Sequence, residues 1–245
     1  MKLTILSLCL TILTFAQINN NAQPIHFAEP ELIEVKGGTF RMGCRDYDGF
    51  AWEYPVHKVA VSSFKIAKYE VTQKQWISIM GTNPSHFKGD NLPVENVSWL
   101  DVQEFISKLN EITEKNYRLP TESEWEYAAR GGKKGKNYKY SGSNKIDEVA
   151  WYLENSENST HPVGTKKPNE LGIYDMCGNV AEWCDNVYEN YFGAEDFQFD
   201  DSEIFRVLRG GKWDSEPPFC RVSFRGRTPQ HFKYNHLGFR LVLQE

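Results

Sequence analysis

Residues 117–132 read YRLPTESEWEYAARGG, and this stretch carries a clear local structural signal. Thr121 is followed three positions later by Glu124, the spacing at which two side chains each satisfy an unpaired backbone N–H at the start of a helix. Gly131 and Gly132 follow the run WEYAAR, and glycine readily adopts the backbone conformation that ends a helix. The stretch therefore predicts a short helix with a defined beginning and end.

The same signal occurs twice more along the chain. Thr72 with Gln75 opens the run QKQWISIM, and Ser98 with Asp101 opens WLDVQEFISKLNEITEKN, where Asp is a weaker partner than Glu. In this last run the apolar residues at helical spacing form one stripe: Val102, Phe105, Ile106, Leu109 and Ile112. We therefore expect three helices.

Between the helices, short strand-like runs alternate with clusters of Gly, Pro, Asn and Asp. HKVAVSSFKIAKYEVT (57–72) and FRLVLQ (239–244) are the clearest of these runs. Aromatic residues make up 14% of the chain, a share that is typical of ordered loops held by large side chains. No repeat or linker interrupts this pattern after about residue 30, which predicts one compact, loop-rich α+β domain.

The N-terminus predicts the compartment. Lys2 precedes an uncharged apolar run (3–16) that is too short to span a membrane; the run ends at the small residue Ala16, and a second small residue, Ala22, follows. Residues 1–22 have the layout of a secretory signal peptide, cleaved after one of these two alanines. We therefore expect an exported chain, periplasmic or extracellular, without a transmembrane segment in its mature part.

The net charge and the cysteines exclude some classes of binding site. The net charge of −5 argues against binding to nucleic acid, which needs basic surfaces. Four cysteines follow the predicted signal peptide: Cys44, Cys177, Cys184 and Cys220. Exported cysteines usually pair, and three pairings of four are possible. The spacing of Cys177 and Cys184 fits neither a zinc ribbon nor a CxxC redox motif.

Seven stretches together resemble one known family. In chain order they are GGTFRMG (37–43), YEVTQKQW (69–76), PVENVSWLDVQEF (93–105), YRLPTESEWEYAARGG (117–132), VGTKKPNELGIYDMCGNVAEW (163–183), RVLRGGKW (206–213) and HLGFRLV (236–242). On these motifs the chain is identified as a member of the formylglycine-generating-enzyme, or sulfatase-modifying-factor, family. The resemblance covers nearly all of residues 27–245, which we expect to form the family's domain.

The resemblance implies a fold related to C-type lectins, with helices beside a small twisted sheet. Some members of the family use copper and O₂ to convert a sulfatase cysteine to formylglycine. Others form sulfoxides with iron, modify peptidic siderophores, or bind ligands and partners without known catalysis. Because the fold hosts all of these, the reaction must be argued from the site.

The resemblance also implies structural calcium, which takes oxygen ligands. One site would use the main-chain carbonyls of Cys177, Gly178 and Val180 with the carboxylate of Glu182. A second, weaker site would begin at Asn155 and Ser156. The carboxylate expected there is missing, because the matching position is Gly164.

The copper centre of the family is changed in this sequence. Copper-dependent members place two cysteines, with four residues between them, after a double glycine, and Cu(I) prefers such a pair of thiolates. Measured from Gly210 and Gly211, the second cysteine is Cys220 but the first is Ser215. Lys212 replaces the family's serine directly after the glycines. These departures argue against copper and against formylglycine generation, and Cys220 is the one catalytic candidate left.

By analogy with non-catalytic relatives, we expect Cys220 to pair with Cys184. The region that matches the family's active-site groove contains Lys212, Trp213, Ser215, Arg221 and Arg225. Its basic residues favour a small acidic ligand or a protein partner. The alternative is that Arg225 and Arg240 form ion pairs in the core, and the sequence does not choose between the two.

The histidines do not predict an iron centre of the sulfoxide-forming type. They are scattered along the chain, at His26, His57, His86, His161, His231 and His236, and none are paired at i,i+4. His231 and His236 are close enough to share a loop. The acidic and aromatic stretch 188–205 predicts a long loop, either a functional one or a solvated insertion.

The leading hypothesis is an exported, non-catalytic binding or accessory module of the cell envelope. Its rival is a copper- and O₂-dependent oxidase that acts on a sulfatase cysteine, against which Ser215 and Lys212 argue. A third possibility is another oxidative reaction at a metal site that the sequence does not reveal.

Overall fold

The computed structural model describes residues 27–44, 49–191 and 203–244, so the predicted signal peptide lies outside the described residues. Within these ranges the helices are α1 (Gln73–Met80), α2 (Trp99–Thr113), α3 (Glu122–Ala129) and α4 (Ile146–Val149), with 3-10 turns η1 (Ala51–Glu53), η2 (Gly132–Lys134) and η3 (Pro217–Cys220). The strands are β1 (Leu32–Val35), β2 (Gly38–Met42), β3 (His57–Val61), β4 (Phe64–Ala67), β5 (Tyr117–Arg118), β6 (Ala181–Val187), β7 (Phe205–Arg209), β8 (Arg225–Pro229), β9 (Leu237–Gly238) and β10 (Val242–Leu243).

The three predicted helix starts are confirmed as α1, α2 and α3. At α3 the hydroxyl of Thr121 accepts the Glu124 N–H at 3.2 Å, and the Glu124 carboxylate accepts the Thr121 N–H at 2.8 Å. The predicted apolar stripe of α2 is buried as far as Leu109. Ile112, which lies in the last turn before the left-handed Glu114, is 41% exposed, so its predicted burial is wrong.

The strands form two four-stranded sheets and one hairpin. The first sheet has the order β1-β4-β10-β5, the second has the order β8-β7-β6-β9, and β2 pairs with β3. The predicted run 57–72 supplies β3 and β4, whereas only Val242 and Leu243 of the run 239–244 pair as a strand. Parallel pairing of β6 with β9 brings residues 236–238 beside the start of β6.

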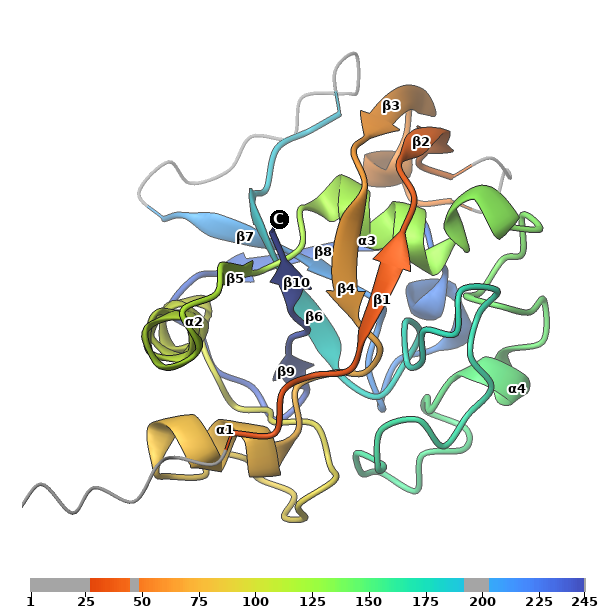
Figure 1. Cartoon of the computed structure of the whole chain (residues 1–245). Helices are drawn as coiled ribbons and strands as arrows, with labels where there is room; N and C mark the ends of the chain where they lie inside the picture. The colour runs from red at the N-terminus through yellow and green to blue at the C-terminus, as the bar shows by residue number, and fades with distance from the viewer. Residues whose placement is uncertain (1–26, 45–48, 192–202, 245) are drawn as a thin grey trace, which may run out of the picture.

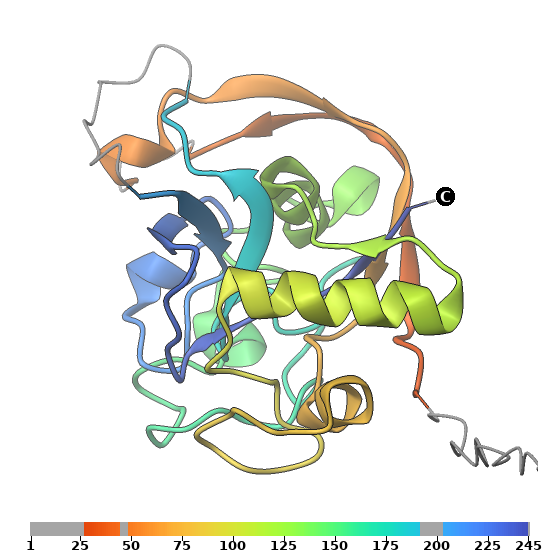
Figure 2. The same cartoon turned by 90° about the vertical axis from the view of Figure 1, so that its left-hand side faces the viewer.

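Helix α3 lies between these layers and connects them. It contacts β2 and β3 on one side and β6 and β7 on the other, and Figures 1 and 2 show it between the front strands and the cyan β6. Helix α2 packs against α1 and β5. Trp125 and Trp183 are fully buried in the two hydrophobic clusters. The fold is thus a single compact α+β domain, as predicted.

No helix within the described residues has the length and apolar composition needed to cross a membrane. The core instead contains several fully paired charges. Arg240 is completely buried, and its Nη2 and Nε donate to the two carboxylate oxygens of Glu182 at 2.6 and 2.7 Å. Such a pair must be complete, because removing one partner leaves an uncompensated charge in the core.

We therefore predict that Arg240→Met lowers the free energy of unfolding by about 3–5 kcal/mol, because it leaves the Glu182 carboxylate without its cation. Urea denaturation of the mature chain measures the change. Lys108→Met is the matched control, since Lys108 pairs with Glu104 on the exposed face of α2 and such a pair contributes about 0.3–0.5 kcal/mol. Equal effects of the two substitutions would contradict the structural role of Arg240.

Candidate functional site

A double-glycine turn positions the segment that the sequence singled out. Strand β7 ends at Arg209, and Gly210 and Gly211 follow with φ values of 95° and 74°. A Cβ atom on Gly211 would lie 2.6 Å from the carbonyl oxygen of Phe219 and 2.8 Å from the sulfur of Cys220. Only glycine fits at this close approach, so the end of η3 packs directly on the turn.

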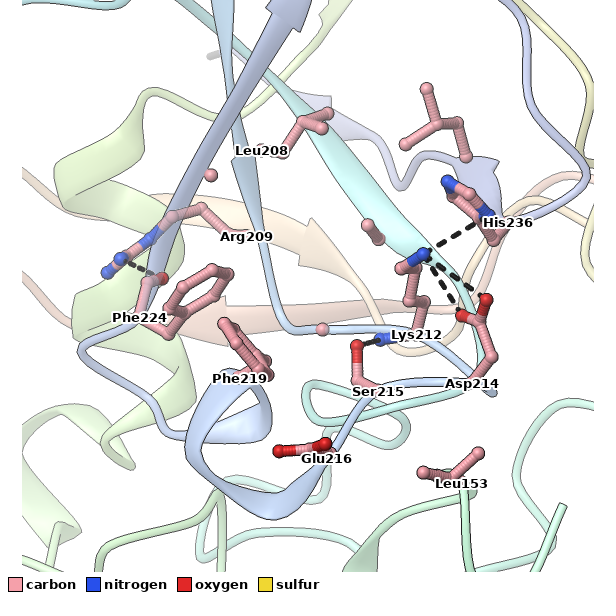
Figure 3. A pocket seen from close by; sticks show the side chains of 14 residues that line it. Leu153, Leu208, Arg209, Lys212, Asp214, Ser215, Glu216, Phe219, Phe224 and His236 are labelled. Atoms are coloured by element: carbon pink, nitrogen blue, oxygen red, sulfur yellow. Dashed lines mark hydrogen bonds and ion pairs between the residues drawn. The ribbon is translucent and has the colours of Figure 1, made fainter. Parts of the chain in front are cut away.

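A pocket of about 360 Å³ opens beside this turn (Figure 3). Its lining comes from the 153 loop, from strands β6 to β9, and from the segment 211–219. The apolar lining residues are Leu153, Ala181, Leu208, Phe219, Phe224 and Leu237. The polar ones are Arg209, Lys212, Asp214, Ser215, Glu216 and His236. The pocket is therefore an apolar cavity with a polar group of residues on one side.

The polar groups of the pocket bind one another. Lys212 Nζ lies 3.1 Å from Asp214 Oδ1 and 3.4 Å from His236 Nδ1, the contacts drawn as dashed lines in Figure 3. Burial, and secondarily the Lys212 charge, lowers the pKa of His236 to about 4. The imidazole is therefore neutral near pH 7, and its Nδ1 accepts a hydrogen bond from the Lys212 ammonium group. The Lys212 charge is compensated locally by Asp214.

Ser215 and Cys220, the positions of the family's thiolate pair, have different surroundings. Ser215 lines the pocket, and its hydroxyl accepts the Lys212 backbone N–H at 3.1 Å. Cys220 is fully buried beneath the turn, and this burial raises the pKa of its thiol above the ordinary value. The arrangement therefore offers a hydroxyl and a protonated thiol where copper chemistry needs two thiolates.

The prediction of a basic groove is wrong for Arg221 and Arg225, because neither side chain reaches the surface. Arg221 and Arg225 are 2% and 3% exposed. Arg221 donates to Glu53 at 2.6 Å, and Arg225 donates to both oxygens of Glu122 at 2.6 and 2.8 Å. A buried guanidinium group needs such a partner. The sequence left open a second interpretation, in which Arg225 and Arg240 form ion pairs in the core. The structure shows this arrangement for both residues.

Trp213 lies near the pocket without lining it. Its indole N–H donates to the carbonyl of Asn235 at 3.1 Å, and its ring meets that of Phe87 edge-on at 5.5 Å between centroids. Trp213 thus connects the segment after the double glycine to the loop 230–236. Its role is to support the wall that carries His236.

The expected Cys184–Cys220 disulfide is not formed in the structure: Cys177, Cys184 and Cys220 are buried, and no disulfide joins them. The two cysteines have different neighbours. The charges acting on the Cys184 thiol include those of Glu122 and Arg209, whereas the Cys220 thiol lies by Cys177 and the backbone amides of Lys212 and Gly178. The pairing carried over from relatives therefore does not apply to this arrangement.

The polar side chains of the predicted calcium ligands already make hydrogen bonds within the protein, except that of Ser156. Both oxygens of Glu182 accept hydrogen bonds from Arg240, and one also accepts from the Trp125 indole at 2.7 Å. At the weaker site, the side-chain oxygen of Asn155 accepts the Tyr152 N–H, while the buried hydroxyl of Ser156 has no partner among the described residues. The described residues contain no group of three or more acidic, histidine or cysteine ligands suited to a metal. Calcium therefore remains an untested prediction.

Several pocket residues were not predicted from the sequence. Phe219, Phe224 and Glu216 have no periodic or motif signal, and His236 was considered only as a possible loop partner of His231. These two histidines do share the loop 230–236, where Phe232 and Tyr234 lie between them. The parallel pairing of β9 with β6 brings His236 to the pocket, and a single sequence does not reveal that pairing. Most of the predicted 188–205 loop lies outside the described residues.

Comparisons with known proteins agree with the motifs. Residues 15–245 match the family described as "Sulfatase-modifying factor enzyme 1-like domain". "Chaperone protein LppX" of Paenibacillus barcinonensis is 38% identical, over 85% of this chain and 86% of that protein. "Inactive C-alpha-formylglycine-generating enzyme 2" of Mus musculus is 28% identical, over 88% of this chain and 86% of that protein. Among solved structures, "Treponema denticola variable protein 1" superposes with a TM-score of 0.79 at 30% identity, covering 90% of this chain and 97% of that one.

The free thiols lead to a first prediction at this site. Alkylation in denaturant without a reductant should modify Cys44, Cys177, Cys184 and Cys220 as fully as alkylation after reduction. In the native protein the reaction should be slow, because each of these side chains is at most 4% exposed. Peptide mapping measures both. A peptide pair joined through Cys184 and Cys220 would overturn the free-thiol assignment.

A second prediction concerns His236. We expect NMR of the imidazole to give a midpoint near pH 4, and folding stability to fall as the pH decreases from about 6.5, the pKa of histidine in an unfolded chain, towards 4. Lys212→Met should raise the midpoint, but not to 6.5, because burial is the larger cause. Lys233→Met, in the same loop but paired with Asp101, should leave it unchanged. A wild-type midpoint near 6.5 would contradict the buried, neutral imidazole.

Proposed function

The chain belongs to the sulfatase-modifying-factor family, and we propose that it is a non-catalytic member: a binding or accessory module of the cell envelope that assists another polypeptide. One observation carries the proposal. Copper-dependent relatives need two thiolates at these positions. This chain has the Ser215 hydroxyl, which accepts the backbone N–H of Lys212, and the Cys220 thiol, which is buried beneath the turn.

The chemistry of these two groups supports the loss of the copper reaction. A serine hydroxyl is a hard, weakly acidic donor that does not replace a thiolate on Cu(I). Cys220 is fully buried, which disfavours its ionised form. Lys212, at the position of the family's serine, also brings an ammonium group next to the polar side of the pocket. A centre that exchanges thiolates with a substrate cysteine has no support in these residues.

The accessory role has separate support. The relative with 38% identity is named a chaperone, which is a role exercised through binding. The sulfatase-modifying paralogue with 28% identity carries the word inactive in its name. Export and an envelope location rest on the signal-peptide layout of residues 1–22.

We predict that the reduced wild-type protein, titrated anaerobically with Cu(I), does not hold the ion against a competing chelator. Ser215→Cys should gain binding of one Cu(I), and adding Cys220→Ser to that variant should abolish the gain, because both thiolates are needed. The spectrum of the Cu(I)–chelator complex measures the transfer of the ion.

An oxygen electrode provides the second readout, with a cysteine-containing peptide as co-substrate. Tight Cu(I) binding by the wild type, together with O₂ consumption that depends on the peptide, would establish the oxidase instead. In that case Cys220 is catalytic, and the binding-module proposal is wrong.

A further inference from the structure

Two like charges face solvent on the hairpin formed by β2 and β3. Arg41 of β2 lies directly opposite Lys58 of β3 in the antiparallel ladder, and both side chains are exposed. Residues opposite each other in such a ladder have Cβ atoms about 4.5–5.5 Å apart, a separation at which like charges destabilise the pair. Neither side chain has an ion-pair partner among the described residues. The positive charge of the pair is therefore uncompensated.

The rest of the chain pairs its charges with opposite ones. Strand β1 precedes β2 and strand β4 follows β3, and on this second ladder Glu34 lies directly opposite Lys65. The buried arginines follow the same rule, because each of them has a glutamate partner. Natural proteins keep a local conflict such as the pair of Arg41 and Lys58 mainly at functional sites. The pair is therefore a candidate binding site.

The packing of the hairpin keeps the two cations together. Its inward face buries Met42, and Phe40 packs on Tyr127 of α3 with ring centroids 5.3 Å apart. Figures 1 and 2 show the hairpin on the outside of the molecule with one face turned towards α3. A slip of one residue in register would expose the apolar side chains. Gly43, directly after β2, also donates its N–H to the buried carboxylate of Glu126 at 2.9 Å.

An open hollow of about 390 Å³ lies beside the two cations, lined by Thr39, Phe40, Arg41, Val56 and Lys58. Thr39 is exposed on the same face as Arg41, two residues earlier and about 6–7 Å away along the strand. The hollow therefore offers two cations and a hydroxyl group to one ligand. Its volume is in the range of about 300–1,000 Å³ that is typical of small-molecule sites. It shares no residue with the pocket beside the double glycine.

The two cations favour a ligand group with two negative charges. A phosphate monoester carries a charge of about −1.5 to −2 at pH 7 and has three acceptor oxygens. A carboxylate or a sulfate ester carries a single negative charge and would leave one of the two cations uncompensated. The net charge of the chain is −5, but salt screens distant charges beyond about 8 Å. The adjacent cations therefore decide which anion binds.

We propose that Arg41, Lys58 and Thr39 bind the phosphate group of a small organic phosphate monoester. The planar guanidinium group of Arg41 donates to two phosphate oxygens, an arrangement that its fork of N–H groups favours. The Lys58 ammonium group and the Thr39 hydroxyl group donate to the third oxygen. The organic part of the ligand lies in the remainder of the hollow, against Phe40 and Val56. Binding compensates both cations and removes their mutual repulsion.

The test compares phenyl phosphate with phenyl sulfate, which differ mainly in charge, by NMR titration of the isotope-labelled mature protein. We expect phenyl phosphate to bind roughly fivefold more tightly, with shifts of the backbone amide signals of Thr39 and Arg41. Inorganic phosphate should bind more weakly than phenyl phosphate, because it fills only part of the hollow.

A matched pair of double variants separates the site from general charge effects. Arg41→Met with Lys58→Met should weaken the binding of phenyl phosphate by at least about tenfold, because the charge-assisted hydrogen bonds are lost. Lys74→Met with Lys108→Met removes the same total charge from the surfaces of α1 and α2 and should leave the binding unchanged. Circular dichroism verifies that both variants remain folded.

Lys58→Glu provides an independent measurement of the like-charge contact. This substitution gives Arg41 an opposite charge across the ladder, so the variant should unfold at a higher urea concentration than the wild type. The same variant should no longer bind phenyl phosphate. A gain in stability together with a loss of binding distinguishes a functional pair of cations from a purely structural one.

Equal affinities for phenyl phosphate and phenyl sulfate would overturn this inference, and so would unaffected binding by the folded double variant at positions 41 and 58. A lower urea midpoint for Lys58→Glu would contradict the repulsion on which the site rests. Inorganic phosphate that binds as tightly as phenyl phosphate would refute the organic ester as the ligand. None of these outcomes bears on the Cu(I) titration, which tests the non-catalytic assignment at a different site.

Discussion

The site depends on the compensation of one buried cation, the guanidinium group of Arg209. It pairs with Glu126 of α3 and donates to the carbonyl oxygens of Ser223 at 2.9 Å and Val222 at 3.1 Å. A desolvated cation needs such partners; the Nε of Arg209, which makes no hydrogen bond among the described residues, still lies 3.8 Å from Glu122 Oε1. Arg209 thereby connects three segments directly before the double-glycine turn: helix α3, the end of β7 and the segment before β8. The position of the pocket follows from that connection.

The same requirement explains why the arginine-rich C-terminal segment does not make a basic surface. Glu126 also pairs with Arg130 and accepts the Gly43 N–H at 2.9 Å, so a single carboxylate joins α3 to the N-terminal strands. Each buried arginine is matched by a glutamate from a distant part of the chain. The buried arginines are therefore neutralised inside the core and add no positive charge to the surface. Among the described residues, the uncompensated charge at the pocket is that of Glu216.

The sequence predicted the features that depend on near neighbours. The three capping boxes involve residues three positions apart, and each of them formed. The double glycine and the register of Ser215 and Cys220 were also readable, because they lie within one short segment. The ion-pair partners of Arg221 and Arg225 could not be predicted, because they lie 168 and 103 residues away in the sequence. The pocket could not be predicted either, because its walls come from segments that meet only through sheet pairing.

The two departures from the family's copper motif also shape the pocket. Ser215 in place of a cysteine gives the Lys212 backbone N–H an acceptor, which holds the loop after the double glycine. Lys212 in place of a serine directs its ammonium group to Asp214 and His236, so the three polar side chains contact one another. A reactive centre needs polar groups that remain available to a substrate. A binding pocket needs them occupied, so that the apolar surface of Leu208, Phe219 and Phe224 decides what enters. The geometry around Lys212 meets the second requirement, which supports the proposed binding role.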